Sequence, residues 1–62
     1  MKVTIHDPLS ASVDSPQGTL NVFLHAYYPP NGMYRVQIPQ GLLSAEELRA
    51  IAEAILLLCA DK

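Results

Sequence analysis

The sequence predicts a small α+β protein in which a three-stranded, mainly antiparallel sheet packs on one C-terminal helix, in the order β-β-β-α. Residues 45–60 contain no Gly or Pro and have helical periodicity. Three earlier stretches are rich in the β-branched and aromatic residues that suit strands. The length of 62 residues is enough for one thin core. We therefore expect a single domain over residues 1–62.

The helix has a strong start signal at Ser44. Ser44 and Glu47 have the spacing of a capping box, in which the hydroxyl and the carboxylate each accept a backbone N–H of the first turn. At about 100° per residue an apolar stripe follows, and we expect this stripe to pack on the sheet. Its members are Leu48, Ile51, Ala52, Ile55, Leu56, Leu58 and Cys59.

The opposite side of the predicted helix is charged only in its first two turns. Farther along, Leu57 lies among alanines that include Ala54. A single exposed Leu is ordinary on a protein surface. A large apolar residue in a small-residue setting is also typical of contacts between subunits. Ala54 and Leu57 are therefore candidate residues of a dimer contact.

Three stretches predict the strands. Residues 1–6 alternate between apolar and polar, and residues 19–28 and 33–38 read as a hairpin closed by turn formers at 30–32. A three-residue loop sets Ala26 opposite Val36 and keeps the apolar side chains on one face, which a one-residue slip would destroy. Residues 7–18 read mainly as loop. Two alternatives stay open there: Leu9 and Val13 tuck under the helix edge, or 9–13 forms a short edge strand.

In that register, the hairpin face turned away from the helix mixes aromatic and polar side chains. We expect Tyr27 opposite Arg35 and His25 opposite Gln37, with Phe23 one step further along. Aromatic residues and Arg are over-represented in interface hot spots. Cross-strand pairs of the same types can also serve only to stabilise a sheet. These five side chains are the candidate binding residues.

The sequence offers little for catalysis, metals or cofactors. His6, Asp7 and His25 could meet only if the first strand paired beside the hairpin, and they lack the spacing of a metal site. The serines at 10, 12 and 15 lie in the expected loop, whereas a nucleophile needs a rigid mount and an oriented base. We expect no enzyme activity, no metal and no cofactor.

Charge and cysteine content narrow the range of partners. Six acids and four scattered bases give a net charge of −2, which disfavours nucleic acid, because nucleic-acid binding relies on clustered Lys and Arg. The apolar runs are too short to span a membrane. The single cysteine, Cys59, excludes an intrachain disulfide and fits a reducing compartment. We expect a cytoplasmic protein that does not enter a membrane.

These observations predict a small protein-binding module that acts as an adaptor, regulator or inhibitor of a larger protein through the exposed sheet face. The alternative is a self-assembling structural homo-oligomer. Under either hypothesis we expect a homodimer, because a core of this size is thin. A third and less favoured hypothesis is a single-stranded nucleic-acid binder that stacks bases on Phe23 and Tyr27.

Overall fold

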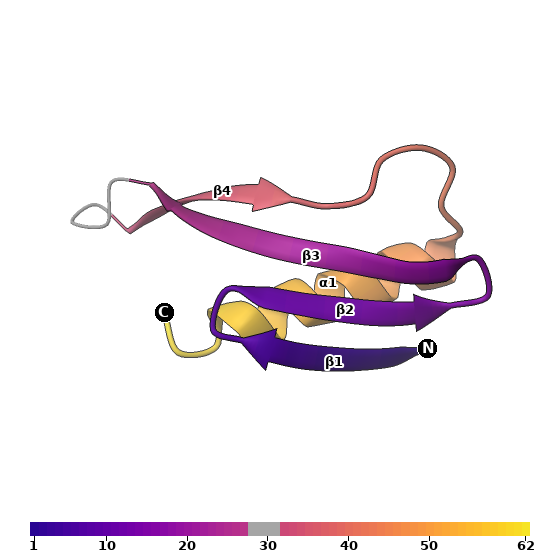
Figure 1. The fold of residues 1–62 in the computed structure, drawn as a ribbon, viewed down its shortest axis with the longest axis horizontal. Coiled ribbons are helices and arrows are strands. Elements are labelled where there is room, and N and C mark those ends of the chain that lie inside the picture. The colour runs from indigo at the N-terminus through magenta and orange to yellow at the C-terminus, as the bar shows by residue number, and fades with distance from the viewer. Residues whose placement is uncertain (28–31) are drawn as a thin grey trace.

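The computed structural model describes residues 1–27 and 32–62. The described residues form four strands and one helix: β1 (Lys2–Asp7), β2 (Ser10–Ser15), β3 (Gly18–Tyr27), β4 (Met33–Gln37) and α1 (Ala45–Cys59). All strand pairs are antiparallel, and the sheet order follows the chain order (Figure 1). The α+β class with a C-terminal helix is confirmed. The prediction of three strands is wrong.

The additional strand is β2, which lies in the segment predicted mainly as loop. It pairs with β1 on one side and with β3 on the other, so it is a central strand and neither a loop nor a short edge strand. Its inward residues Ala11 and Val13 are buried, and the Ser12 hydroxyl is 2.8 Å from Nε2 of His6. Pairing on both edges outweighs the weak strand propensity of a Ser-rich segment.

The pairing of β3 with β4 differs from the predicted register by two residues. The observed opposite pairs are Phe23 with Gln37, Leu24 with Val36, His25 with Arg35, Ala26 with Tyr34, and Tyr27 with Met33. A two-residue shift keeps every side chain on its predicted face, so the core-face criterion that excludes a one-residue slip cannot detect it. Most of the predicted turn, together with Tyr28, falls on residues 28–31, outside the described part of the chain.

The predicted capping box is confirmed at the start of α1. The Ser44 hydroxyl accepts the Glu47 N–H at 3.0 Å, and Oε1 of Glu47 accepts the Ser44 N–H at 2.8 Å. The amide of Gln17, between β2 and β3, also donates to Oε1 of Glu47 at 3.3 Å. Glu47 is only 1% exposed. This carboxylate therefore joins the helix start to the β2–β3 connection.

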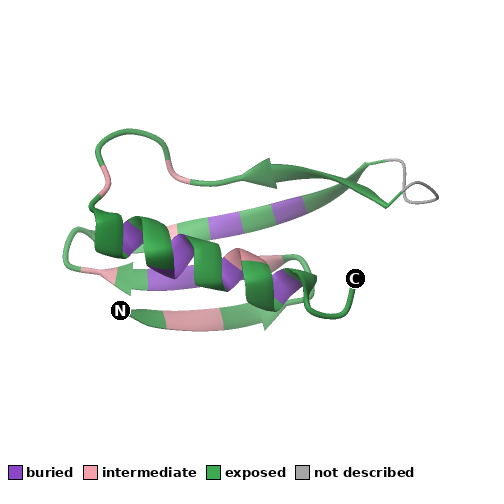
Figure 2. Cartoon of the chain, turned by 180° about the vertical axis from the view of Figure 1, so that it is seen from behind, coloured by how far each residue is buried: buried purple, intermediate pink, exposed green. Residues whose placement is uncertain are grey.

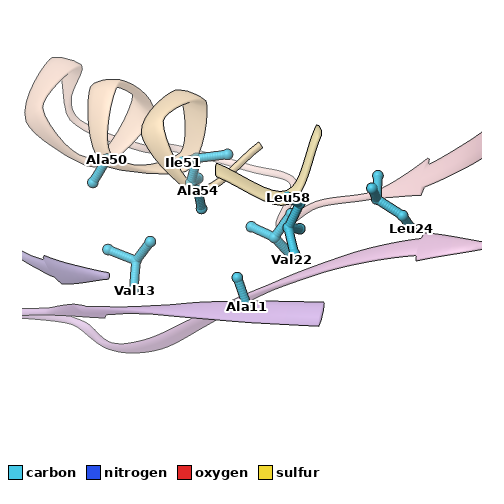
Figure 3. Packing of buried hydrophobic residues seen from close by; sticks show 8 residues of the cluster. All are labelled: Ala11, Val13, Val22, Leu24, Ala50, Ile51, Ala54 and Leu58. Carbon is cyan, nitrogen blue, oxygen red and sulfur yellow. The ribbon is translucent and has the colours of Figure 1, made fainter. Parts of the chain in front are cut away.

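The helix buries a different line of residues from the predicted stripe. Ala50, Ile51, Ala54 and Leu58 face Ala11, Val13, Val22 and Leu24 across the core (Figure 3). Ile51 and Leu58 agree with the prediction, and Ile55 packs partly buried against the core. Leu48, Ala52, Leu56 and Cys59 are exposed instead. The reason is that Glu47 lies on the sheet side, and residues spaced three or four apart from it follow on the same side.

The helix covers only part of the sheet. It lies mainly over β1 and β2 and reaches β3, while all five residues of β4 are exposed (Figure 2). Strands lie about 4.8 Å apart and a helix is about 10 Å wide, so one helix spans about half of a four-stranded sheet. β4 and the last residues of β3 therefore extend beyond the core.

The capping box predicts the effect of Ser44→Ala. Loss of the hydroxyl leaves a first-turn N–H without its acceptor, which should lower the free energy of unfolding by about 1 kcal/mol. Urea titration followed by circular dichroism measures this change. Ser44→Asp is the matched control, because an Asp side chain also caps helices and should keep the midpoint near that of the original chain. An Ala variant with an unchanged midpoint would contradict the cap.

Glu47 predicts a pH dependence of stability. The backbone N–H of Ser44 is the main cause that holds the pKa of Glu47 below its ordinary value of 4.5. A group with a lowered pKa in the folded state stabilises above its unfolded pKa and loses this contribution as the pH falls through the folded value. The urea midpoint should therefore fall further in acid for the original chain than for Glu47→Gln. Glu46→Gln, which keeps Glu47, is the control, and its urea midpoint should fall as far as that of the original chain. An equal fall for Glu47→Gln and the original chain would contradict this role of Glu47.

The buried line of α1 predicts a steric effect at Ala54. This residue is 0% exposed, so Ala54→Leu should force the helix away from the sheet and cost about 1–3 kcal/mol in the free energy of unfolding. Thermal and urea unfolding measure the loss. The same change at Ala60, which is exposed beyond the helix, should have little effect. Comparable losses at both positions would contradict the observed helix orientation.

Candidate functional site

The side of the sheet opposite α1 carries no other layer among the described residues (Figure 1). On this side the β3–β4 hairpin presents the five predicted binding residues, Phe23, His25, Tyr27, Arg35 and Gln37, all of them exposed. We call these five side chains the outer face. Their alternation along the two strands places them on one side, as the sequence predicts.

The outer-face side chains contact one another diagonally across the two strands. Arg35 lies opposite His25, so the predicted direct pairs of Tyr27 with Arg35 and of His25 with Gln37 are wrong. Nε2 of His25 is nevertheless 3.1 Å from Oε1 of Gln37, and the Arg35 guanidinium carbon is 5.6 Å from the Tyr27 ring centroid. Long side chains reach diagonal neighbours in a sheet. The expected neighbours therefore meet despite the shifted register.

The outer face combines rings with one cation. The rings of Phe23 and His25 have centroids 6.5 Å apart and an interplanar angle of 33°. Arg35 lies within the range of a cation–π contact with Tyr27, which holds the guanidinium against the sheet. Mutual contact restricts the rotamers of these side chains before any partner arrives. The result is a partly ordered surface of aromatic rings, one amide and one positive charge.

Two shallow depressions flank the outer face. One, of about 420 Å³, is lined by His25, Tyr27, Arg35, Val36 and Gln37. Its neighbour, of about 320 Å³, has Phe23 and Gln37 in its wall together with residues of the early part of β3 and of the segment after β4. Gln37 lines both depressions. Open depressions of this kind accept protruding side chains of another protein better than they enclose a small molecule.

The histidines are separated and engaged with other residues. His6 lies on β1 and His25 on β3, with β2 between them, so the cluster considered from the sequence does not form. The carboxylate of Asp7 accepts the Leu9 N–H at 2.7 Å, and this bond is the main cause that lowers the Asp7 pKa. Within residues 1–27 and 32–62, no three His, Cys, Asp or Glu side chains are grouped as metal ligands.

The structure separates the two helix residues of the candidate dimer contact. Ala54 is completely buried against the sheet, so a second chain cannot reach it. Leu57 is 49% exposed and lies beside β1, where it lines a depression of about 630 Å³ together with Ile5 and His6. Ala54 and Leu57 therefore cannot both contact a second chain, contrary to the prediction.

A second exposed apolar surface was not expected from the sequence. Tyr34 and Val36 lie on the helix-facing side of β4, and Leu48 and Leu56 lie on α1; they are 41%, 51%, 52% and 72% exposed, respectively. We call these four side chains the open half-face. The alternation of Ala11 and Val13 with polar residues is a signal for a fourth strand. A four-stranded sheet is too wide for one helix to cover, so this signal also indicates an exposed apolar surface.

In the described part of the chain, no helix is both long enough and apolar enough to cross a membrane. Comparisons with protein-family models, with curated proteins and with solved structures find no match to this chain.

Proposed function

We propose that this chain is a non-catalytic protein-binding module that docks onto a larger protein through its outer face. The observation that carries the proposal is the grouping of two exposed aromatic side chains with an arginine on an uncovered sheet. Tyr27 is 51% exposed and Phe23 is 37% exposed. Aromatic residues and Arg are the types most enriched in interface hot spots, whereas solvated sheet faces are usually rich in small polar and charged residues.

The contacts within the outer face indicate the chemistry of the partner. Arg35 lies against the Tyr27 ring, a geometry that still presents guanidinium N–H groups to a planar acceptor such as a carboxylate. Phe23 and the nearby depression suit an apolar side chain. We therefore propose a partner surface on which an acidic side chain lies next to an apolar one.

The same features support a binding role over catalysis and over nucleic acid. The depressions on the outer face are open and shallow, and His25 is engaged with Gln37. Lys2 is on β1, at the far edge of the sheet from Arg35 on β4. Nucleic-acid binding depends on clustered cations, and these two are spread apart. Cys59 is free and exposed, which suits the reducing cytoplasm as the place of action.

Self-association is the second candidate function, and we retain the homodimer as a proposal. The observation that favours it is the open half-face, which lies on the opposite side of the sheet from the outer face. Large exposed apolar patches on small proteins often mark contact surfaces. A dimer formed there would leave the outer face available to a different protein.

The outer face is tested by the double change Phe23→Ala with Tyr27→Ala. Affinity capture from the source cell with the original chain as bait identifies a co-purifying protein, and calorimetry with that purified protein gives the affinity. Loss of two hot-spot rings should weaken binding at least about tenfold. Circular dichroism must first establish that the variant is folded.

Lys2→Ala with Asp14→Ala is the matched control. These two residues lie opposite each other on β1 and β2, and alternation places them on the same side of the sheet as the outer face but away from the hairpin. The control should bind with unchanged affinity. If the folded double variant binds as tightly as the original chain, the proposed function is refuted. The rings of Phe23 and Tyr27 would then serve only to stabilise the sheet.

A further inference from the structure

The helix-facing side of β4 is an apolar surface that α1 leaves open, with the Lys62 ammonium near one of its residues, Tyr34. Val36 lies opposite Leu24, and Tyr34 lies opposite Ala26, so both point to the side on which α1 packs. The position of Tyr34 agrees, because Nζ of Lys62, just after α1, is 5.8 Å from the Tyr34 ring centroid. Four strands span about 19 Å and one helix about 10 Å. Val22 and Leu24 of β3 are buried under α1, so the uncovered strip runs along β4 (Figure 2).

The helix has a second apolar face that its own sheet does not use. Leu57 lies beside β1, and at about 100° per residue Leu48 lies on the opposite flank, toward β3 and β4. Leu56 lies about 160° around the helix from the buried Ala54 and so points away from the sheet. The charged residues Glu46, Arg49 and Glu53 fall on the β1 flank and the adjoining top. The flank toward β4 therefore carries no charge.

These two surfaces complement each other on one and the same chain. The strip along β4 lacks a helix, and α1 has an apolar face that lacks a sheet. A helix of 15 residues is about 22 Å long, and the five residues of β4 extend over about 17 Å, so the strip contacts most of the length of such a helix.

We propose that a second copy of this chain fills the open half-face. Each copy places the Leu48 and Leu56 face of its α1 on Tyr34 and Val36 of the other copy, which makes the contact reciprocal and closed. This inference rests on the proposed self-association and assigns its surfaces. A foreign helix in the strip could cover β4 but would leave most of the Leu56 face of α1 in water, whereas a second copy covers both surfaces at once.

The exposed area is close to what a dimer of this size needs. The exposed fractions of the four open-half-face residues amount to about two whole side chains. At about 200 Å² for a large side chain, this is on the order of 400 Å² per copy. Ala26, Ala52 and Cys59 are also exposed and add to it. Two copies thus approach the roughly 1,000 Å² of total buried surface that marks a specific interface.

Two charge substitutions and their mixture test this arrangement. Light scattering coupled to gel filtration should give the original chain the mass of two copies at micromolar concentration. Leu56→Glu and Val36→Lys should each give the mass of one copy, because an unpaired charge would be buried at both reciprocal contacts. Mixing the two variants in equal amounts should restore the mass of two copies. In the mixed dimer, the Glu at position 56 of one chain meets the Lys at position 36 of the other. The second contact joins the unchanged Leu56 and the unchanged Val36.

The controls separate this inference from the other proposals. Leu57→Glu, one residue along α1 on the β1 flank, should keep the mass of two copies, as should the Phe23 and Tyr27 double variant. Circular dichroism checks the folding of every variant. If Leu56→Glu does not fold, Leu56→Gln takes its place, and if Val36→Lys does not fold, Val36→Thr takes its place. Both tested positions are at least half exposed, which favours folding.

Three results would overturn the inference. If the original chain has the mass of one copy up to millimolar concentration, self-association and the inference both fail, and the binding role of the outer face is unaffected. If the original chain and both folded variants have the mass of two copies, self-association stands but uses another surface. If the mixture of the two single-copy variants does not restore the mass of two copies, α1 does not lie on β4 of the other chain.

Discussion

A helix is about half as wide as a four-stranded sheet, and the exposed surfaces of this protein follow from that mismatch. One helix can cover β1, β2 and the near side of β3, and the core forms there. Small residues in this region, Ala11, Ala50 and Ala54, allow the helix to approach the strands closely. The last residues of β3 then extend past the core, and β4 is exposed along its whole length.

The rotation of the helix about its axis decides which apolar side chains reach the core. The capping box and the bond from Gln17 hold Glu47 on the sheet side of the first turn. The helical repeat then directs Ile51, Ala54 and Leu58 to the same side. As a consequence, Leu48 and Leu56 are exposed to solvent. A polar contact at the helix start thus leaves part of the apolar surface of the helix available for association.

The two candidate surfaces lie on opposite sides of one hairpin. The outer face has rings, an amide and a guanidinium, which suits recognition of a mixed polar and apolar surface. The open half-face is almost entirely apolar, which suits a lasting contact between identical chains. In the proposed dimer the helices lie between the two sheets, so the two outer faces point away from each other. Such a dimer would present two binding surfaces and could engage two sites on its partners.

The sequence by itself determined what depends on near neighbours in the chain. The helix start at Ser44 follows from contacts within four residues, and the membership of the outer face follows from alternation along each strand. The tertiary structure decided that β2 is a central strand, that β3 and β4 pair two residues away from the expected register, and that Ala54 is buried while Leu56 is exposed. These features depend on strand pairing and on helix packing between distant segments. Local propensity and periodicity are the same for each alternative, so only contacts across the fold distinguish them.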